Sequence, residues 1–434
     1  MSTKSYNFLS KKIDIKKNSI GIVGLGYVGL PLVKRFIKAG NKKIYGVDSD
    51  KRKVESLRKG TSHINSITIK YFKRNTNNIS TDYLILKNAD IIIICLPTPL
   101  KSKNKPDLKY LSDCYKKLSK IDLQNKIIIL ESTVYPGVTR KFANKVIFNN
   151  KKLKIGKNVF FGYSPERENP GDKSFSYQKT PKVISGYTKN CLKLMKNIYS
   201  SIAKKTFLCN TLEEAETSKL LENLYRSINI GLANEMKLIC NKLGINVHNV
   251  IESAATKNFG FQKFTPGPGL GGHCIPIDPY YLSWVSEIHG YEPKLLKSAA
   301  KINNSMPKFI INKILSYFKK KPRILIFGVS YKKNVDDDRE SPSFEFMNIF
   351  KKKKIKFDYF DPYFPKIKKG RKISLEKKSI KLSITNVKNY DCALIITDHD
   401  FFDYNFIKRN FKFVFDSRGV FFRKKIFSPN IIQV

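Results

Sequence analysis

Acidic residues are scarce in this chain of 434 residues, which has 35 Asp and Glu against 82 Lys and Arg and a formal net charge of +47. No apolar run approaches the roughly 20 residues that a membrane-spanning helix needs, so membrane insertion is not expected. The seven cysteines include no C-x-x-C pair and the five histidines are scattered, which argues against a disulfide framework and a bound metal. The opening residues lack an apolar stretch of secretory length, which predicts a cytoplasmic protein.

The positive charge is unevenly distributed along the chain. Between Thr211 and Ile310 there are ten basic and nine acidic residues, so almost all of the excess lies in the flanking parts. There the lysines occur in short runs mixed with Asn and Ile, without the aromatic side chains on which single-stranded nucleic acids stack. We therefore expect a solvated lysine-rich surface and no nucleic-acid partner, with a polyanion-binding surface as the alternative.

The first part of the chain has the pattern of a doubly wound α/β fold. An apolar run from Ser19 to Val23 leads into GLGYVG and a stretch with helical spacing, and the β-rich run KKIYGVD ends at Asp48. Further short apolar runs follow in ADIIIIC, NKIIILES, NVFFGYS and PKVISG. Because strands that alternate with helices form parallel sheets, this pattern predicts a parallel sheet covered by helices on both faces.

The rest of the chain is predicted to contain a long helix and a second sheet. From about Thr211 to Gly244, apolar residues recur every three or four positions, which indicates one amphipathic helix of about 30 residues. A second helical stretch reaches Lys320, after which KPRILIFGVS begins a new series of strands, continued by IKFDYFDPY, DCALIITDH and KFVFDSRG. The sequence therefore predicts two Rossmann-like domains with doubly wound parallel sheets, joined by a long central helix and a helical segment. The expected boundaries are 1–210, 211–320 and 321–434.

A glycine motif between the first predicted strand and helix indicates a dinucleotide site. Gly24 allows a tight turn, Gly26 lets a pyrophosphate approach the backbone, and Gly29 permits close helix packing. Asp48 ends the second predicted strand, where its carboxylate can accept hydrogen bonds from both ribose hydroxyls. That carboxylate would repel a 2′-phosphate, so the motif favours NAD over NADP.

A second group of residues suggests covalent chemistry. Cys274 lies in the glycine-rich segment PGPGLGGHCIPIDP, four residues before Asp278, and the glycines leave room beside its sulfur. A reactive thiol needs a nearby cation. Lys219 on the long helix is the candidate, with Asn223 one turn further along the same face. The alternative is an inert buried cysteine and a solvated lysine and amide.

These motifs together resemble the nucleotide-sugar 6-dehydrogenases, the family that contains the UDP-glucose and UDP-N-acetylhexosamine 6-dehydrogenases. The resemblance implies an NAD-binding Rossmann domain, a central dimerisation segment, and a C-terminal domain that holds the UDP moiety. It also implies a homodimer or a higher homo-oligomer. The matching stretches follow the family's order along nearly the whole chain: GIVGLGYVGLP, ICLPTPL, ESTVYPG, YSPERENPGD, AETSKLLENLYRSINIGLANE, PGPGLGGHCIPIDPYYL, GVSYKKNVDDDRESPS and FDSRGVF.

The resemblance also implies a reaction, in which the C6 alcohol of a UDP-sugar is oxidised twice with two NAD+ through a thiohemiacetal and a thioester. Cys274 would be the nucleophile, and Asp278 would assist the water that hydrolyses the thioester. Lys219 and Asn223 would stabilise the oxyanion at C6, where preorganised donors matter most. The remaining catalytic positions implied by the motifs are Glu166 and Thr133.

The same resemblance assigns binding residues. Each arginine among them can form charge-assisted hydrogen bonds to phosphate. For Arg418, a surface charge in a very basic protein is the alternative. The cofactor-binding residues implied are Gly24, Gly26, Tyr27, Val28, Gly29, Asp48, Lys53, Thr98, Ser132 and Arg339. The substrate-binding residues implied are Glu166, Arg167, Lys219, Asn223, Gly271, Lys332 and Arg418.

The substrate loop SPERENPG resembles the branch of the family that acts on UDP-N-acetylhexosamines, because Pro170 stands where UDP-glucose enzymes carry a second glutamate. The cysteine segment most resembles UDP-N-acetylglucosamine 6-dehydrogenases. UDP-GlcNAc is therefore the expected substrate, in surface polysaccharide biosynthesis, with UDP-ManNAc, UDP-GalNAc and UDP-glucose as alternatives. Two competing classes are a two-electron β-hydroxyacid-type dehydrogenase, which would not need Cys274, and a basic scaffold that binds nucleic acid or membrane.

Overall fold

The computed structural model describes residues 13–62, 64, 69–167, 180–272, 275–367 and 376–434. The chain divides into two compact units. The first unit contains Met1–Glu222 and Tyr280–Val285, and the second contains Asn223–Pro279 and Ser286–Val434. Each unit is built around its own open sheet, in agreement with the predicted fold class.

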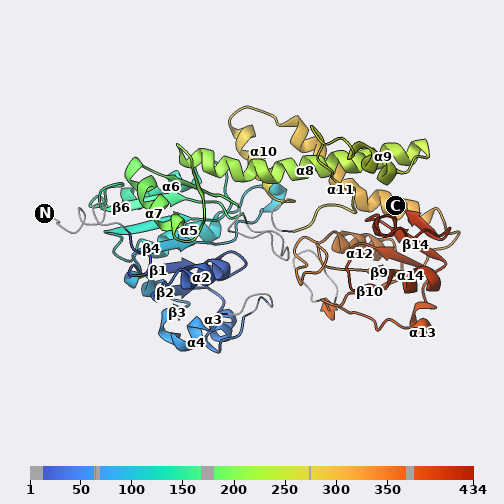
Figure 1. The fold of residues 1–434 in the computed structure, drawn as a ribbon, viewed down its shortest axis with the longest axis horizontal. Helices are drawn as coiled ribbons and strands as arrows, with labels where there is room; N and C mark the ends of the chain where they lie inside the picture. Colours follow the sequence, from blue (N-terminus) through green and yellow to red (C-terminus); the bar gives the residue numbers. More distant parts are fainter. Residues whose placement is uncertain (1–12, 63, 65–68, 168–179, 273–274, 368–375) are drawn as a thin grey trace. The chain divides into compact units, whose positions relative to one another are not determined.

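The sheet of the first unit has eight strands in the order β3-β2-β1-β4-β5-β6-β7-β8 (Figure 1). Its central strands are apolar along their whole length because both faces are buried. All pairings in it are parallel except that of β6 with β7. The strands are β1 (Ile20–Val23), β2 (Ile44–Val47), β3 (Ile79–Ser80), β4 (Ile91–Ile94), β5 (Lys126–Leu130), β6 (Val159–Tyr163), β7 (Lys182–Gly186) and β8 (Thr206–Leu208).

Helices cover both faces of this sheet, as predicted from the alternation of strands and helices. Successive residues of β4 show the two faces, because Ile91 and Ile93 pack with α2, α3 and α7 whereas Ile92 and Ile94 pack with α5 and α6. The α-helices are α2 (Gly29–Lys38), α3 (Lys51–Arg58), α4 (Tyr71–Arg74), α5 (Lys109–Leu118), α6 (Val138–Asn149) and α7 (Lys189–Ser200). Short 3-10 turns are η1 (Thr76–Asn78), η2 (Tyr83–Asn88) and η3 (Ser102–Asn104).

One pairing differs from the others, because β7 runs antiparallel to β6. Gly162 lies opposite Gly186, and Tyr163 lies opposite Ser185. An antiparallel neighbour can return along the same edge of the sheet, whereas a parallel one needs a crossover that passes over a face. The reversal therefore places the start of β7 beside the end of β6.

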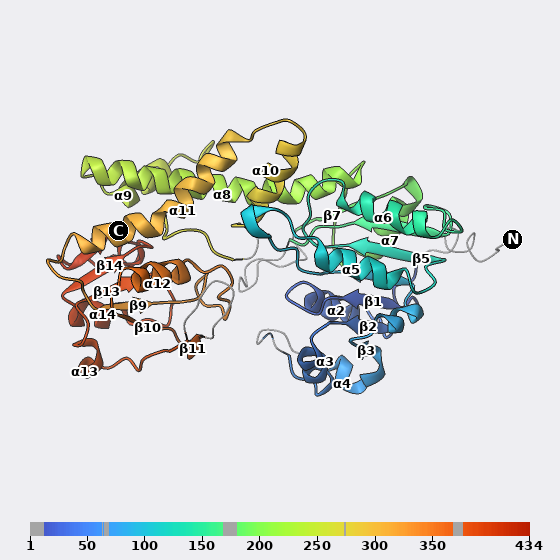
Figure 2. The same ribbon diagram turned by 180° about the vertical axis from the view of Figure 1, so that it is seen from behind.

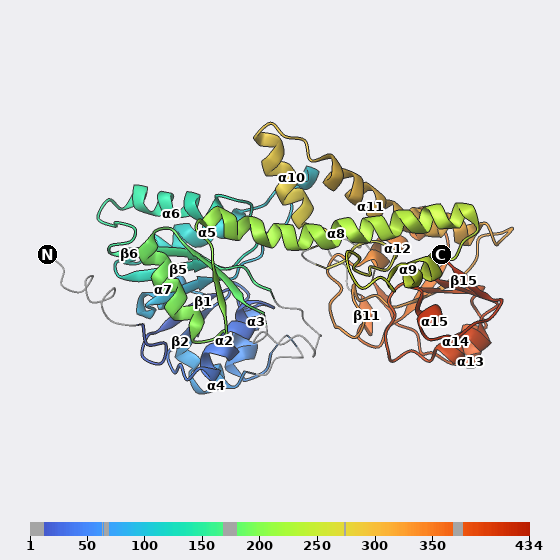
Figure 3. The same ribbon diagram turned by 45° about the horizontal axis from the view of Figure 1, so that its top comes forward.

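The long helix predicted between Thr211 and Gly244 is present as α8 (Leu212–Leu243), which has 32 residues (Figure 3). It ends at Gly244, whose φ of 71° is the left-handed conformation that glycine adopts readily. Gly231, inside α8, is buried against Ala299 of α11. The other helices that follow are α9 (Val247–Ala254), α10 (Asp278–Ile288) and α11 (Lys294–Leu315). Among the described helices, none combines the length and apolar character that crossing a bilayer requires.

The second unit contains a five-stranded sheet, entirely parallel, in the order β10-β9-β13-β14-β15 (Figure 2). Helices α11 and α12 pack on one face and α14 and α15 on the other. Four of its strands were predicted, but the edge strand β15 was not. The strands are β9 (Ile324–Phe327), β10 (Phe357–Phe360), β13 (Cys392–Ile395), β14 (Phe413–Asp416) and β15 (Ile431–Gln433), with a small ribbon of β11 (Lys366–Ile367) and β12 (Lys377–Lys378). The helices are α12 (Pro342–Lys352), α13 (Ile384–Val387), α14 (Tyr404–Asn410) and α15 (Val420–Arg423).

The contact between α8 and α11 predicts a specific sensitivity at Gly231. A Cβ added there would lie 3.2 Å from the Cβ of Ala299 and 3.3 Å from its Cα, so a large side chain would force the two helices apart. We expect Gly231→Leu to lower the free energy of unfolding by about 1–3 kcal/mol, measured by denaturant unfolding. The control is Arg226→Leu at an exposed position of the same helix, and an equal loss in both variants would contradict the packing explanation.

Candidate active site

The glycine turn of the first unit lies between β1 and α2 and has the geometry of a dinucleotide cradle. A Cβ added at Gly24, whose φ is 91°, would lie 2.5 Å from the carbonyl oxygen of Cys95. At Gly29 it would lie 1.9 Å from the carbonyl oxygen of Gly24, whereas at Gly26 nothing lies within 4 Å. Gly24 and Gly29 are therefore required by packing, and Gly26 leaves the backbone open to an approaching pyrophosphate.

The N-terminus of α2 contributes to the same cradle. Val28 is its N-cap residue and provides no side-chain hydrogen bond, and the amide of Leu30 donates to the carbonyl of Gly26 at 3.1 Å. No capping side chain therefore stands between the start of the helix and an approaching anion. Val28 and Tyr27 are both half-buried and pack against the core of the first unit.

Asp48 lies directly after β2 and is anchored beside the glycine turn. One carboxylate oxygen accepts a hydrogen bond from the amide of Leu25 at 3.0 Å, and the other accepts one from the amide of Asp50 at 3.0 Å. The Nζ of Lys53 lies 3.8 Å from the first of these oxygens. The arrangement fits the ribose of a dinucleotide, because a carboxylate fixed by the glycine turn can accept hydrogen bonds from its hydroxyls.

Three further candidates follow β4 and β5 at the same edge of the sheet. The Oγ1 of Thr98 donates a hydrogen bond to the carbonyl of Thr133 at 2.7 Å, and the hydroxyl of Tyr281 donates one to the carbonyl of Thr98 at 2.8 Å. Ser132 is buried, and its hydroxyl has no hydrogen-bond partner within the described part of the chain. A buried hydroxyl without a protein partner is a reason to expect a bound group or water beside it.

Glu166 and Arg167 lie in the segment that follows β6. One carboxylate oxygen of Glu166 accepts a hydrogen bond from the amide of Arg167 at 2.8 Å, and the other has no hydrogen-bond partner among the described atoms. The guanidinium of Arg167 donates to the carbonyl of Pro181 at 3.0 Å and also binds the Glu222 carboxylate. Arg167 is therefore held by protein groups on two sides.

Two catalytic candidates meet directly in the second unit. The side-chain amide of Asn223, on α8, donates a hydrogen bond to the carboxylate of Asp278, the first residue of α10. Both side chains are buried. Lys219 is also buried and lies one helical turn before Asn223 on α8. Cys274 lies outside the described residues.

The glycine-rich segment before Cys274 is fixed at several points within the second unit. The amide of Gly267 donates to the side chain of Asn234 at 2.8 Å, and the amide of Gly272 donates to the carbonyl of Arg339 at 3.0 Å. A Cβ added at Gly271 would lie 2.8 Å from the Cβ of Tyr331. Gly271 therefore serves close packing of this segment against the residues that follow β9.

The three basic candidates of the second unit follow the carboxyl ends of its strands. Lys332, after β9, is half-buried, and the guanidinium of Arg339 forms an ion pair with Asp337 at 2.6 Å. The Nε of Arg418, after β14, donates to the carbonyl of Ile396 at 2.7 Å. These residues therefore gather at the edge where open parallel sheets bind ligands.

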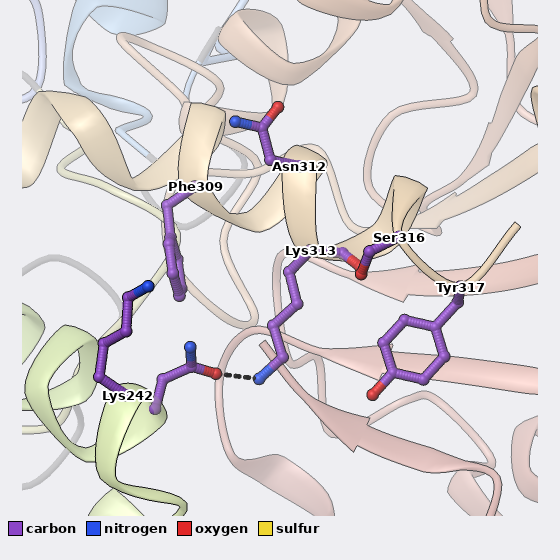
Figure 4. A pocket seen from close by; sticks show the side chains of 7 residues that line it. Lys242, Phe309, Asn312, Lys313, Ser316 and Tyr317 are labelled. Carbon is purple, nitrogen blue, oxygen red and sulfur yellow. Dashed lines mark hydrogen bonds between the residues drawn. The ribbon is translucent and has the colours of Figure 1, made fainter.

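A cavity of about 560 Å³ in the second unit lies elsewhere, between the C-terminal turns of α8 and α11 (Figure 4). Lys313 reaches across it to bind the side chain of Asn241. No residue predicted for the site lines this cavity, so we assign it no part in the reaction. Its lining residues are Asn241, Lys242, Phe309, Asn312, Lys313, Ser316 and Tyr317.

A buried ion pair beside the candidate residues was missed from the sequence. Lys182 and Glu131 lie 2.9 Å apart in the first unit, and both side chains are almost completely buried. In the sequence, each charged residue only flanks an apolar run: Lys182 precedes one in PKVISG, and Glu131 follows one in NKIIILES. Nothing in either run indicated that the two charges would meet.

Comparison with known proteins shows which proteins this chain is similar to over most of its length. Three domain models of the UDP-glucose/GDP-mannose dehydrogenase family match this chain. The NAD binding domain matches residues 18–203, the central domain matches 213–305 and the UDP binding domain matches 325–423. The UDP-N-acetyl-D-glucosamine 6-dehydrogenase of Pseudomonas aeruginosa is 32% identical over 357 residues, which cover 80% of this chain and 84% of that protein. The UDP-N-acetyl-D-mannosamine dehydrogenase of Methanococcus vannielii is 33% identical over 403 residues, covering 90% and 88%. The solved structure of the UDP-D-ManNAc dehydrogenase from Pyrococcus horikoshii is 28% identical, with a TM-score of 0.82 and coverage of 95% and 97%.

The glycine turn predicts two different effects of adding one methyl group. We expect Gly26→Ala to weaken NAD+ binding at least tenfold, or by about 1.4 kcal/mol, with little change in melting temperature, because its Cβ would enter the open approach to the backbone. Gly29→Ala should instead destabilise the fold by about 1–3 kcal/mol, because its Cβ would clash with Gly24. Calorimetric titration with NAD+ and thermal unfolding measure the two effects, and NAD+ binding unaltered in a folded Gly26→Ala variant would contradict the proposed cradle.

Proposed function

Because the chain belongs to the UDP-glucose/GDP-mannose dehydrogenase family, we propose that it oxidises the C6 alcohol of a UDP-N-acetylhexosamine to the uronic acid. It is an NAD-dependent oxidoreductase that acts on a CH–OH group. UDP-GlcNAc is the first candidate substrate and UDP-ManNAc the second, since relatives of both kinds align with most of the chain. The proposed setting is the cytoplasm, with the product used for surface polysaccharide.

The hydrogen bond between Asn223 and Asp278 is the observation that best supports the proposed chemistry. A side-chain amide has two N–H donors, so Asn223 can orient Asp278 with one and still offer the other to an oxygen at C6. Lys219, one turn earlier on the same helix, supplies a positive charge for the same developing oxyanion. Asp278, fixed at the start of α10, can then hold or deprotonate a water.

Cys274 is proposed as the nucleophile that retains the intermediate between two oxidations. NAD+ held by Gly24, Gly26 and Asp48 would supply the hydride acceptor for C6 in each oxidation, and the hydroxyl proton passes to a protein base. The thiolate of Cys274 adds to the aldehyde to form a thiohemiacetal, and loss of the second hydride leaves a thioester. Water then cleaves the C–S bond and releases the carboxylate and the thiol. One alcohol therefore yields one carboxylate, two NADH and three protons, with one water consumed.

The binding candidates complete the proposal. Gly24, Gly26 and Asp48 hold the cofactor in the first unit. In the second unit, Lys332 and Arg418 bind the nucleotide diphosphate by charge-assisted hydrogen bonds. Arg339 is assigned to the cofactor by its motif position, although its guanidinium is paired with Asp337, so this contact requires that pair to open or to be shared.

The electron count of the reaction distinguishes the main alternatives. With limiting UDP-GlcNAc, UDP-ManNAc, UDP-GalNAc or UDP-glucose and excess NAD+, we expect two NADH per sugar for one of the N-acetylated substrates. Cys274→Ser should lose formation of the acid, whereas Cys209→Ser, at a buried cysteine outside the proposed site, should retain it. One NADH per sugar would favour the two-electron dehydrogenases, and no NADH with any of the four would refute the substrate class.

A homodimer built on α8 is the proposed assembly. Leu221, Tyr225, Leu232, Ile239 and Leu243 are each at least 45% exposed. Their spacings of four and seven residues place them on one stripe of a helix with 3.6 residues per turn. An apolar stripe of this length on one helix is the usual signature of a covered surface, and the family resemblance makes a second copy the expected partner.

This assembly predicts a change of mass in solution. We expect Leu232→Glu to shift the protein from dimer to monomer in light scattering coupled to size exclusion, because a charge would be buried in the apolar contact. Arg226→Glu, at an exposed position on another side of α8, should remain dimeric. A wild-type protein that is monomeric at micromolar concentration would refute the proposed interface.

A further inference from the structure

A lysine buried in the sheet of the first unit contacts two segments that the proposed function assigns to the site. Lys182 is the first residue of β7 and is 2% exposed. Its Nζ donates hydrogen bonds to the Glu131 carboxylate at 2.9 Å and to the carbonyl of Pro165 at 3.1 Å. The second carboxylate oxygen of Glu166 lies 3.8 Å from the same Nζ. One ammonium group therefore connects the end of β5 with the segment after β6.

The reversed strand explains how Lys182 reaches this position. Because β7 is antiparallel to β6, its first residue lies at the carboxyl end of β6. The register that pairs Gly162 with Gly186, continued along both segments, brings Lys182 opposite Glu166. A hydrogen bond of 2.7 Å from the hydroxyl of Ser164 to the carbonyl of Val183 shows that the two segments stay together beyond the ladder.

Glu131 anchors the other side of the connection. It directly precedes Ser132 and Thr133, and its amide donates to the carbonyl of Ile94 at 2.9 Å. Its second carboxylate oxygen accepts a hydrogen bond from the hydroxyl of Tyr199, on α7. Burial raises the pKa of Glu131, and the Lys182 ammonium opposes that change. Lys182 and Tyr199 therefore fix the carboxylate of Glu131, the residue before Ser132, through two hydrogen bonds.

Among the residues that the structure describes, Lys182 is the buried cation beside Glu166. The described groups that face Glu166 are the Glu131 carboxylate, the Lys182 ammonium, the Cys95 thiol and the neighbouring Arg167. The Arg167 guanidinium is directed to Pro181 and Glu222, and burial raises the pKa of Cys95, which keeps that thiol neutral. The carboxylates of Glu131 and Glu166 thus share one buried ammonium.

The separation of 3.8 Å has a chemical consequence. At this distance the ammonium stabilises the charge on Glu166 without occupying the second oxygen by a direct hydrogen bond. That oxygen is buried and has no hydrogen-bond partner in the described structure. It can accept a proton from water or from another reacting group at the site.

We propose that Lys182 is a positioning residue of the oxidation site: its ammonium holds the Glu166 carboxylate aligned with the Ser132–Thr133 segment, and Glu131 holds that ammonium in place. This inference rests on the proposed function of Glu166 as a catalytic residue. It assigns a role in the reaction to a lysine that acts through Glu166 and Glu131.

Three variants separate this role from simple support of the fold. Lys182→Met removes the charge and keeps the length of the side chain. The double variant Glu131→Gln/Lys182→Met also removes the anion that would otherwise be left without a cation. The matched control is Lys126→Met, at another buried lysine of the same sheet, whose Nζ donates to the carbonyls of Lys87 and Ala89 at the opposite end of β5.

We expect Lys182→Met to lower kcat roughly 10- to 100-fold, within the range of general acid–base effects, with less than about a threefold change in KM for NAD+. The double variant should regain melting temperature but not kcat. Lys126→Met should lose melting temperature while it keeps the wild-type kcat.

Recovery of kcat together with melting temperature in the double variant would overturn the proposal, as would a wild-type kcat in Lys182→Met. A crystal structure of Lys182→Met gives a test that does not depend on turnover. We expect the Glu166 carboxylate to move away from the end of β5, and an unchanged Glu166 would also overturn the proposal. If the wild-type enzyme oxidises none of the four UDP-sugars, the proposed function fails, and this structural comparison still decides whether Lys182 positions Glu166.

Discussion

The parallel hydrogen bonding of β1, β2, β4 and β5 is the constraint on which the site of the first unit depends. Strands that run in one direction end at one edge, so the segments that follow them meet there although they are far apart in sequence. The glycine turn, Asp48 and Thr98 are each the first polar or flexible elements after an apolar strand, and Ser132 follows Glu131 directly after β5. The apolar strands provide no chemistry, but their burial on both faces fixes the direction and register that bring these residues together.

The one reversed pairing makes a different contribution. If β7 were parallel to β6, its first residue would lie at the edge of the sheet opposite to Glu166. Because it is antiparallel, a lysine at the start of a strand lies among the carboxyl ends of its neighbours. Lys126 illustrates the contrast, since it begins the parallel strand β5. Its ammonium donates hydrogen bonds to the backbone carbonyls of Lys87 and Ala89, at the edge of the sheet opposite to the site. Two buried lysines in equivalent sequence positions thus acquire different surroundings from strand direction alone.

The features that could be predicted from sequence are those encoded by local spacing. GLGYVG with Asp48, the apolar repeat of α8, and the strand runs of both sheets each depend on residues within a few turns or one strand. The direction of β7, the edge strand β15 and the pairing of Lys182 with Glu131 depend on contacts across many residues, which no local pattern records. Local patterns likewise selected Asn223 and Asp278, but their hydrogen bond joins the middle of one helix to the start of another.

The net charge of +47 and the ion pairs of the site act on different scales. Exposed charges are screened over about 8–10 Å at physiological ionic strength, so the lysine-rich surface affects the approach of an anionic nucleotide sugar more than the state of a buried carboxylate. Inside the sheet, the effective dielectric is lower and a single ammonium at 3–4 Å dominates. The placement of Glu166 is therefore governed by Lys182, which Glu131 holds, rather than by the excess of basic residues, and the same site geometry would work on a neutral surface.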